Sequence, residues 1–485
     1  MINVRLIYKI LGSLLFLESL FMVLCLCVAL FYHEDDVFAF IISILSTQLA
    51  AYVLRFLGRD AVNSMGRRDA FLVVTLTWCV YSLFGTLPFI TGGYITNFTN
   101  AYFETMSGFT TTGATILDDV EHLPHGILFW RSLTQWVGGL GIVFFTIAIL
   151  PSMVGGSVKV FSAEATGPIK TKLHPRLSTS AKSIWVIFLL LTLLCLASFK
   201  VLGMDWFDSI NYAMTTIATG GFATHNDSIE FFRSPALEYV STFFCFLSGI
   251  NFILLYQLFF KGSLRRILSN VEVQFYCLLT LVFTAFIMFM LMHSNGYGVE
   301  KAFRCAIYQV VSFITTTGLF NDDAAQWPHV TWIVLAVCMF TGACAGSTSG
   351  GFKSVRCVML LKGLQNEFRQ LLHPRAVLPL RISDVNVSMQ RRVTLLAFLT
   401  VYCLLCILCG FTMTAAGVDN TNAITITIST LSNVGPTLGM EIGPTMSWDE
   451  LPDFAKWMCS LLMLMGRLEI FSVLIIFTPV FWKDR

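Results

Sequence analysis

Ten apolar segments recur along this chain, and they limit the fold it can adopt more than any other feature. A helix needs about 20 apolar residues to cross the hydrocarbon core of a bilayer. Of the 485 residues, 56% are hydrophobic and 12% are charged, whereas an ordinary soluble domain is about 25% charged. The sequence therefore predicts an all-α, polytopic membrane protein. The predicted spans lie near 7–31, 37–57, 71–92, 127–150, 183–203, 236–260, 273–293, 330–360, 393–416 and 456–481.

The distribution of charge predicts how these spans are oriented. Most of the 31 lysine and arginine residues fall in alternate loops, which are expected to be cytoplasmic. Acidic residues such as Glu34, Asp118 and Asp449 fall mostly on the other side. With an even number of spans, both termini are predicted to be cytoplasmic. No small-residue cleavage site follows the first apolar stretch, so we expect a retained span and not a cleaved signal peptide.

Four segments rich in threonine and glycine lie between pairs of spans, on the predicted outer side. Each follows a stretch of mixed polarity that is too short to cross, so we expect a re-entrant half-helix and a loop. When the four segments are aligned on glycine, four dipeptides occupy equivalent positions: Thr112–Gly113, Thr219–Gly220, Thr317–Gly318 and Val434–Gly435. The segments read "SGFTTTGATIL" (107–117), "TTIATGGFATHN" (215–226), "SFITTTGLFND" (312–322) and "TLSNVGPTLG" (430–439).

The unit of span, half-helix, filter loop and span thus occurs four times as a pseudo-repeat. Two extra N-terminal spans precede the first unit. The predicted boundaries are 1–66 for the two N-terminal spans, then 67–160, 161–268, 269–385 and 386–485 for pore repeats 1 to 4.

The residue types of the loops indicate a cation filter. Irregular backbone is tolerated at membrane depth only where it is buried in protein or lines a water-filled cavity. Glycine lets carbonyl oxygens turn inward, threonine adds a hydroxyl, and four such loops can replace the hydration shell of a monovalent cation. The alternative is that these small residues only let helices pack closely. The presence of four such loops, each after a half-length helix, disfavours that alternative. The candidate ion-binding residues are Thr111, Thr112, Gly113, Ala218, Thr219, Gly220, Thr316, Thr317, Gly318, Asn433, Val434 and Gly435.

These loops carry a family resemblance, together with "TGACAGSTSGGFKSVR" in the eighth span and "MGRLEIF" in the tenth. Over essentially the whole chain they resemble the TrkH branch of the Trk/Ktr/HKT superfamily of potassium transporters. The resemblance implies K⁺ as the transported ion, a bacterial inner-membrane location and a homodimer. It also implies a TrkA-type cytoplasmic nucleotide-binding regulatory subunit. Glycine at all four aligned positions is the potassium-type pattern. Val434 and Pro436 depart from the other loops, so the ring is expected to be only approximately four-fold.

Residues 342–351, "GACAGSTSGG", interrupt the eighth predicted span. Each interior glycine costs a helix about 1 kcal/mol relative to alanine, so we expect this segment to unwind below the filter. The resemblance implies that the loop is a gate. A tightly packed, kinked helix is the alternative. The candidate gating residues in this loop are Gly342, Gly346, Ser347, Thr348, Ser349, Gly350 and Gly351.

Arg467 is the other candidate gating residue. It lies near the middle of the last span, where a charge costs at least about 2.5 kcal/mol, so it is expected to face a cavity or a partner. The resemblance implies an arginine beside the pore below the filter, where its charge would raise the barrier to K⁺. The alternative is a structural pair with Glu469, although residues two apart on a helix face different ways. Glu18, in the first span, is interpreted as structural.

The sequence argues against other functional classes. An enzyme or an ATP-driven pump would need a phosphate-binding loop, and 346–354 lacks the adjacent Gly-Lys of that motif. The 14 cysteines mostly sit singly in apolar runs and are interpreted as small apolar residues. A net charge of +2 gives no reason to expect nucleic acid. A proton- or sodium-coupled potassium symporter of the same fold stays open as the alternative.

Overall fold

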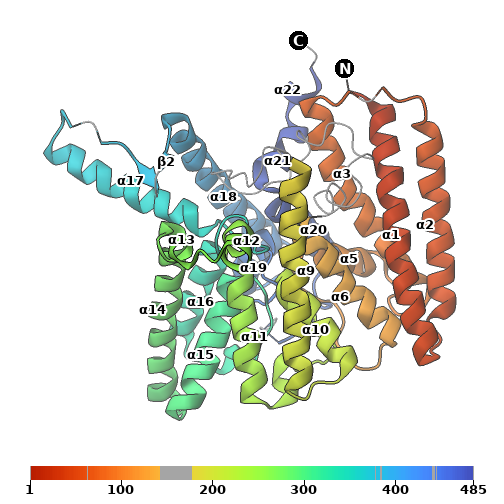
Figure 1. Cartoon of the computed structure of the whole chain (residues 1–485), viewed down its shortest axis with the longest axis horizontal. Coiled ribbons are helices and arrows are strands. Elements are labelled where there is room, and N and C mark those ends of the chain that lie inside the picture. The colour runs from red at the N-terminus through yellow and green to blue at the C-terminus, as the bar shows by residue number, and fades with distance from the viewer. Residues whose placement is uncertain are drawn as a thin grey trace.

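A computed structural model of the chain describes residues 2–62, 64–141, 177–376, 378–382, 385–439, 443 and 445–483. Within these residues the chain is a bundle of helices, and a two-stranded sheet, β1 (Arg381–Ile382) with β2 (Val385–Asn386), is a minor addition. The start of α1 and the short α22 lie at the same end of the bundle (Figure 1). This arrangement agrees with an even number of spans.

The two N-terminal spans form a helical hairpin at one edge of the bundle (Figure 1). These are α1 (Val4–Tyr32) and α2 (Val37–Leu57). Asn3 caps α1 by accepting a hydrogen bond from the Leu6 amide at 3.2 Å. Gly12 lets the two helices approach closely, since a Cβ there would lie 2.7 Å from the Ala51 carbonyl oxygen.

The predicted order of long helix, short helix, loop and second helix recurs four times after this hairpin, which confirms the fold class. Repeat 1 contains α3 (Arg67–Gly85), α4 (Leu87–Thr91), α5 (Phe98–Phe109) and α6 (His125–Leu140). Repeat 2 contains α9 (Leu177–Val201), α10 (Trp206–Ala218), η1 (Ser228–Phe232), α11 (Pro235–Ser248), α12 (Phe252–Lys261) and α13 (Leu264–Leu268). Repeat 3 contains α14 (Val271–Ser294), α15 (Val299–Ile314), η2 (Ala324–Gln326), α16 (His329–Thr341) and α17 (Ser354–Leu372). Repeat 4 contains α18 (Met389–Ala415), α19 (Asn420–Ser432), α20 (Asp453–Leu468), α21 (Ile470–Leu474), η3 (Ile475–Phe477) and α22 (Pro479–Trp482).

The helix that follows the loop in each repeat is short, and after it the chain departs from the helical path. These helices are α6, α11, α16 and α20. Six described helices are long and apolar enough to cross a membrane, or eight if each bent pair counts as one span. The predicted spans 236–260 and 456–481 are such pairs, bent by 104° and 114°, so the expectation of continuous helices is wrong there. The span predicted at 330–360 divides after Thr341, and residues 142–150 of the fourth predicted span lie outside the described residues.

Three of the four breaks have a common local cause. Gly141, Gly342 and Glu469 follow the last residues of α6, α16 and α20, with φ of 87°, 62° and 64°. A residue at positive φ cannot continue a right-handed helix. In repeat 2, the Asn251 side chain accepts from the Ile253 amide at 2.8 Å and so starts a new helix, α12.

Buried apolar side chains form two separate clusters. One joins the N-terminal hairpin to repeats 1 and 4 and includes Trp78 and Trp130. The other joins repeats 2 and 3 and includes Tyr212 and Tyr308. Of the short helices, α5 and α19 contribute to the first cluster, whereas α10 and α15 contribute mainly to the second.

Candidate functional site

The four short helices end in the same backbone turn. In each, an amide donates to the carbonyl oxygen five residues earlier, at 2.8 to 2.9 Å. The donors are Thr112, Gly220, Thr317 and Val434, and their acceptors are Ser107, Thr215, Ser312 and Ser429. Such a turn closes the last carbonyls of a helix. The loops that follow therefore start from one geometry.

Left-handed backbone marks the residues on either side of these donors. The preceding residues, Thr111, Thr219, Thr316 and Asn433, have φ between 53° and 56°. The following glycines, Gly113, Gly221, Gly318 and Gly435, have φ between 80° and 97°. A β-branched residue pays steric strain in the left-handed region, yet three of the four loops place threonine there. This strain is a repeated feature of the site and not a local accident.

The predicted alignment of the second loop is wrong by one residue. The prediction paired Gly220 with Gly113, but the five-residue turn and the positive φ pair Gly221 with Gly113 and Thr219 with Thr111. Ala218 is the last residue of α10 and precedes the loop. Two glycines stand side by side in "ATGGFA", so composition alone could not show which of them corresponds to Gly113. The residue at which α10 ends decides it: because the helix ends at Ala218, Gly221 takes the ring position.

The four loops close into a ring in the order of the sequence. A Cβ built on Gly113 would lie 2.1 Å from the Gly220 carbonyl oxygen, and one on Gly221 would lie 2.2 Å from that of Thr317. A Cβ on Gly318 would lie 2.4 Å from the Val434 oxygen, and one on Gly435 would lie 2.4 Å from the Thr112 oxygen. Each glycine thus abuts a carbonyl of the next loop, and any side chain would collide with backbone.

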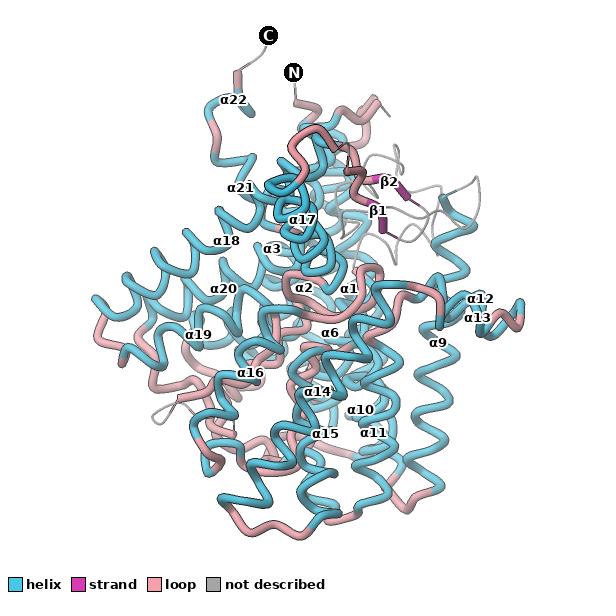
Figure 2. The backbone as a smooth tube through the Cα atoms, turned by 90° about the vertical axis from the view of Figure 1, so that its left-hand side faces the viewer, coloured by secondary structure: helices cyan, strands magenta, loops and turns pink. Residues whose placement is uncertain are grey.

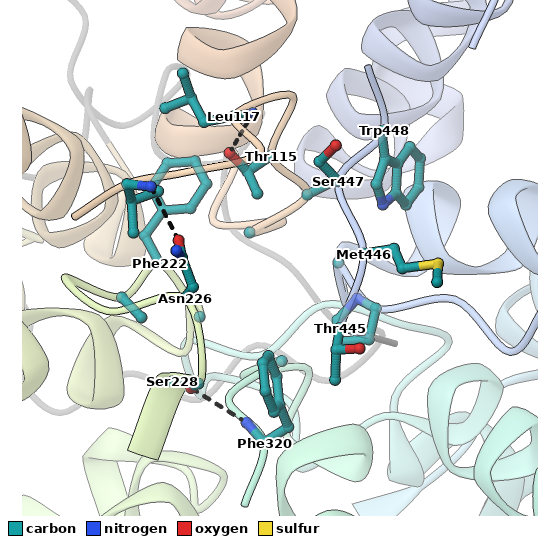
Figure 3. A pocket seen from close by; sticks show the side chains of 18 of the residues that line it. Thr115, Leu117, Phe222, Asn226, Ser228, Phe320, Thr445, Met446, Ser447 and Trp448 are labelled. Atoms are coloured by element: carbon teal, nitrogen blue, oxygen red, sulfur yellow. Dashed lines mark hydrogen bonds between the residues drawn. The ribbon is translucent and has the colours of Figure 1, made fainter. Parts of the chain in front are cut away.

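A polar cavity opens on the outer side of the ring. Its lining includes the four ring glycines, the outer limbs of all four loops, and the side chains of Asp118 and Arg131. Asn226 and Ser228 from repeat 2, Phe320 from repeat 3 and the segment 445–448 from repeat 4 surround this opening (Figure 3). We call this cavity the vestibule.

The vestibule carries negative charge near its rim. Asp119 accepts hydrogen bonds from Asn226 Nδ2 and from the Glu121 amide, both at 3.0 Å. These donors lower the pKa of Asp119, the Asn226 bond first, because they stabilise its ionised form. Asp119 therefore stays ionised at neutral pH and attracts cations to the outer opening.

A buried ion pair supports the first two loops from behind. Arg131 Nε and Glu104 Oε1 lie 2.9 Å apart, and the two side chains are 2% and 0% exposed. Glu104 also accepts from the Ile116 amide at 3.0 Å, while Arg131 Nη1 donates to the Ala223 carbonyl at 3.0 Å. The pair therefore fixes the outer limb of loop 1 and reaches loop 2. The sequence analysis did not identify this pair. The signal was one charged residue in each of two short apolar stretches, since each charge needs a partner.

Gln135 was also missed, and it holds the second loop on both sides of Gly221. Its Nε2 donates to the Gly220 carbonyl at 2.7 Å, and its Oε1 accepts from the Phe222 amide at 3.1 Å. A carbonyl oxygen has two lone pairs, so Gly220 keeps one acceptor site beyond this bond. A lone glutamine in an apolar span was the available signal.

Residues 342–353 form an unwound segment, as the glycines predicted, and the alternative of a continuous kinked helix is wrong. Gly350 donates its amide to Thr316 Oγ1 at 2.7 Å, and a Cβ on Gly350 would lie 2.0 Å from the Ser432 carbonyl oxygen. Thr348 Oγ1 donates to the Ile217 carbonyl at 3.2 Å. The segment therefore packs against the helix ends that carry loops 2, 3 and 4.

The other half of this segment is anchored to the break in repeat 2. Glu272 Oε1 accepts from the Ala345 amide and Asn251 Nδ2 donates to the Ala345 carbonyl, each at 2.6 Å. The Phe252 amide donates to the Gly346 carbonyl at 3.0 Å. Lys353 Nζ donates back to the Ser349 carbonyl and closes the segment on itself. The half at 342–346 is thus anchored to repeat 2, while the half at 347–351 is held against the ends of the short helices.

Arg467 links this segment to repeat 1. Its Nη1 donates to the Thr348 carbonyl at 2.8 Å, and its Nη2 donates to the Gly138 and Gly139 carbonyls at 2.6 Å. Glu469, the partner weighed from the sequence, accepts from Arg356 Nη2 at 2.7 Å. The guanidinium of Arg467 therefore bridges the unwound segment and the end of α6.

Comparisons with known proteins agree with this architecture. Residues 36–483 match the family model TrkH, described as "Cation transport protein". The chain is 36% identical over 483 residues to the Trk system potassium uptake protein TrkH of Halomonas elongata, covering 99% of this chain and 100% of that protein. It is 35% identical to TrkH of Escherichia coli K12, covering 99% of each. The crystal structure of the potassium transporter TrkH from Vibrio parahaemolyticus superposes with a TM-score of 0.89, at 34% identity and 99% coverage of both chains.

Proposed function

Since this chain belongs to the TrkH family of cation transport proteins, we propose that it takes up K⁺ across the bacterial inner membrane through the ring of four loops. Membership of the family makes the chain a transport protein and not an enzyme. Its similarity to proteins named for potassium uptake supports the choice of ion. The single observation that carries the proposal is the closed ring, in which every glycine abuts a carbonyl of the next loop.

The ring would bind K⁺ through backbone carbonyls. Those of Thr112, Gly220, Thr317 and Val434 lie at the contacts between neighbouring loops. The left-handed residues Thr111, Thr219, Thr316 and Asn433 precede them, and Gly113, Gly221, Gly318 and Gly435 follow. Carbonyl oxygens replace the water that K⁺ loses. The C-terminal ends of α5, α10, α15 and α19 would add their negative dipole ends.

Gating is assigned to the unwound segment and to Arg467. Residues 347–351 lie directly below the helix ends that carry loops 2 to 4, so an ion leaving the ring would meet them. Arg467 holds the Thr348 carbonyl. Displacement of this half, while the half fixed to Glu272 and Asn251 stays in place, would open the path inward.

Assembly and control are further parts of the proposal. Helix α17 projects from the bundle (Figure 1), and its large apolar side chains on one face are exposed. Its residues recur at helical spacing, which is typical of a docking face, and we assign this face to a second copy of the chain. Control is assigned to a TrkA-type cytoplasmic nucleotide-binding subunit. The exposed residues of α17 are Leu361, Leu364, Phe368, Leu371 and Leu372.

Ion fluxes in reconstituted vesicles test the proposed function. We expect rubidium, as a tracer for K⁺, to follow its electrochemical gradient, with much slower sodium flux. An internal pH dye should report no proton movement tied to rubidium once the membrane potential is clamped. Rubidium-driven acidification or alkalinisation under the clamp would favour the coupled symporter instead. Equal rubidium and sodium fluxes would refute the assignment to K⁺.

Replacing Thr348 by valine tests the gate separately from the ring. Valine keeps the shape but removes the hydroxyl that donates to the Ile217 carbonyl. A hydrogen bond of this kind contributes about 1 kcal/mol, so basal flux should rise about fivefold with unchanged discrimination against sodium. The matched control is Thr400→Val, because the Thr400 hydroxyl donates only within α18, to the Leu396 carbonyl at 2.9 Å. A change in selectivity with no change in flux would place Thr348 in the filter and not in a gate.

A further inference from the structure

Helix α2 presents one mixed face where it has no neighbour within the described bundle. The helix packs mainly on α1 and α4, at the edge of the molecule in Figure 1 and therefore on its far side in Figure 2. The outward residues recur at spacings of three and four, so they form one stripe. With Phe16 of α1 and with Ala51, they line a groove of about 730 Å³, a size usual for ligand sites. The stripe consists of Leu45, Gln48, Leu49, Tyr52, Arg55 and Phe56.

Two polar side chains in this groove need partners that the described residues do not provide. Among those residues, neither Gln48 nor Arg55 has a hydrogen-bonding partner. Gln48 lies 11 residues after the start of α2, which is 21 residues long, and therefore near the middle of the span. An amide that faces hydrocarbon alone is costly, and a guanidinium near the end of a span can bind an anionic headgroup. The stripe is therefore built for a molecule with both polar and apolar parts.

The length of the stripe matches one leaflet of a bilayer. From Leu45 to Phe56 the helix rises about 16 Å, at about 1.5 Å per residue. Half of the hydrocarbon core is about 15 Å. Arg55 lies two residues before the end of α2 at Leu57, which is the depth of the lipid headgroups.

The headgroup end of the groove is basic. A Cβ on Gly58 would lie 2.6 Å from the Lys9 amide nitrogen and 2.7 Å from the Arg5 carbonyl oxygen, so the start of α1 adjoins the end of α2. Arg5, Lys9, Arg55 and Arg59 therefore gather here. Two acidic residues lie nearby: Asp60 Oδ2 is 3.4 Å from Arg59 Nε, and Asp69 accepts from the Asn3 amide at 2.9 Å. Positive charge is in excess, and a negative headgroup complements it.

We propose that this groove binds one anionic phospholipid. Its phosphate lies against the Arg55 guanidinium, which suits phosphate oxygens, and the Tyr52 hydroxyl, three residues deeper in the groove, faces the glycerol ester oxygens. One acyl chain runs along Leu45, Leu49 and Phe16. The stem of Arg55 is held in place because a Cβ on Gly12 of α1 would lie 2.8 Å from Arg55 Cγ. The site stands outside the four repeats and does not depend on the proposed function.

Lipid titrations of the purified full chain in detergent test the site. Native mass spectrometry or thermal unfolding is followed while phosphatidylglycerol or phosphatidylcholine is added. We expect the unaltered protein to bind phosphatidylglycerol about fivefold more tightly, the effect of about 1 kcal/mol per basic residue near a membrane surface. Arg55→Gln should abolish that preference. The matched control is Arg265→Gln, which loses the same charge at an exposed position of α13, outside both the groove and its basic end.

Three outcomes would overturn the proposal. The first is equal binding of the two lipids to the unaltered protein. The second is an equal loss of preference in both arginine variants, which would indicate a diffuse surface charge and not a site. The third is disulfide-linked dimers of Leu49→Cys in vesicles, above the background from the exposed natural Cys27 and Cys403, which would show that a second copy covers the groove.

Discussion

Replacing Gly113 by serine is expected to destroy discrimination between potassium and sodium. Gly113 has a φ of 82°, and a Cβ would lie 2.1 Å from the Gly220 carbonyl oxygen, so the neighbouring loop must move. Carbonyl ligands displaced by a few tenths of an ångström no longer match a dehydrated K⁺. A loss of only about 1.4 kcal/mol corresponds to tenfold in selectivity, and we expect at least that. Relative rubidium and sodium fluxes in vesicles measure it.

Gly93→Ser is the matched control for this substitution. Gly93 also has a left-handed backbone, with a φ of 74°, but a Cβ there meets nothing within 4 Å. It should therefore show the backbone strain of about 1 kcal/mol without any change in selectivity. If both variants kept the selectivity of the unaltered protein, the ring would not be the filter.

The same experiment tests the corrected alignment of the second loop. Gly221→Ser should behave like Gly113→Ser, because its Cβ would lie 2.2 Å from the Thr317 carbonyl oxygen. At Gly220 the nearest atoms belong to the Gln135 side chain, at 2.4 Å, and a side chain can yield more readily than backbone. Gly220→Ser should therefore have the smaller effect on selectivity. The reverse order would restore the alignment expected from the sequence.

Arg467→Ala is expected to raise basal flux about tenfold. The substitution removes three hydrogen bonds from a charged donor, one to the Thr348 carbonyl and two to the end of α6. The bond to the Thr348 carbonyl alone contributes about 1.5 kcal/mol, which corresponds to about tenfold in an equilibrium, and its loss removes the link between the unwound segment and repeat 1. Loss of a positive charge near the path acts in the same direction. Rubidium uptake per folded protein is the measurement.

Arg467→Lys separates the link from the charge. Lysine keeps the charge but cannot reach carbonyls on two sides with a planar fork. If charge alone sets the barrier, lysine should match arginine. If the bridge matters, lysine should fall between arginine and alanine, as we expect. Arg391→Ala, at the exposed start of α18, controls for the loss of one positive charge. Lower uptake by a well-folded alanine variant, with lysine no better, would falsify a gating role.

The sequence predicted those parts of the fold that depend on composition over many residues. The N-terminal hairpin, the four short helices and the unwinding after Thr341 follow from hydrophobic length, polarity and glycine content. The breaks after α6, α11 and α20 did not follow, because one glycine or one Asn251 within an apolar run hardly changes its average. The glycines in "WVGGLG", "LSGIN" and "MGRLE" were a signal at the level of single residues.

Contacts between distant residues were beyond local reasoning. Glu104 and Arg131 stand 27 positions apart, and their pairing depends on how α5 lies beside α6. Arg467 reaches Gly138 across 329 positions. Residue type suggested that each charge needed a partner, but only the packing of the helices selects which partner. Likewise, the position of the ring glycine in loop 2 depends on where α10 ends.

Because a single chain supplies all four loops, each position of the ring is encoded separately. In a ring built from four identical subunits, one codon change alters every corner together, so intermediate forms are skipped. In this chain a substitution alters one loop of the ring, which we call one corner, and leaves the other three loops unchanged. Asn433 and Val434 already stand where other loops carry threonine or glycine. With the ring as the proposed filter, selection would adjust ion preference one corner at a time, and graded series of filters could be encoded within one gene.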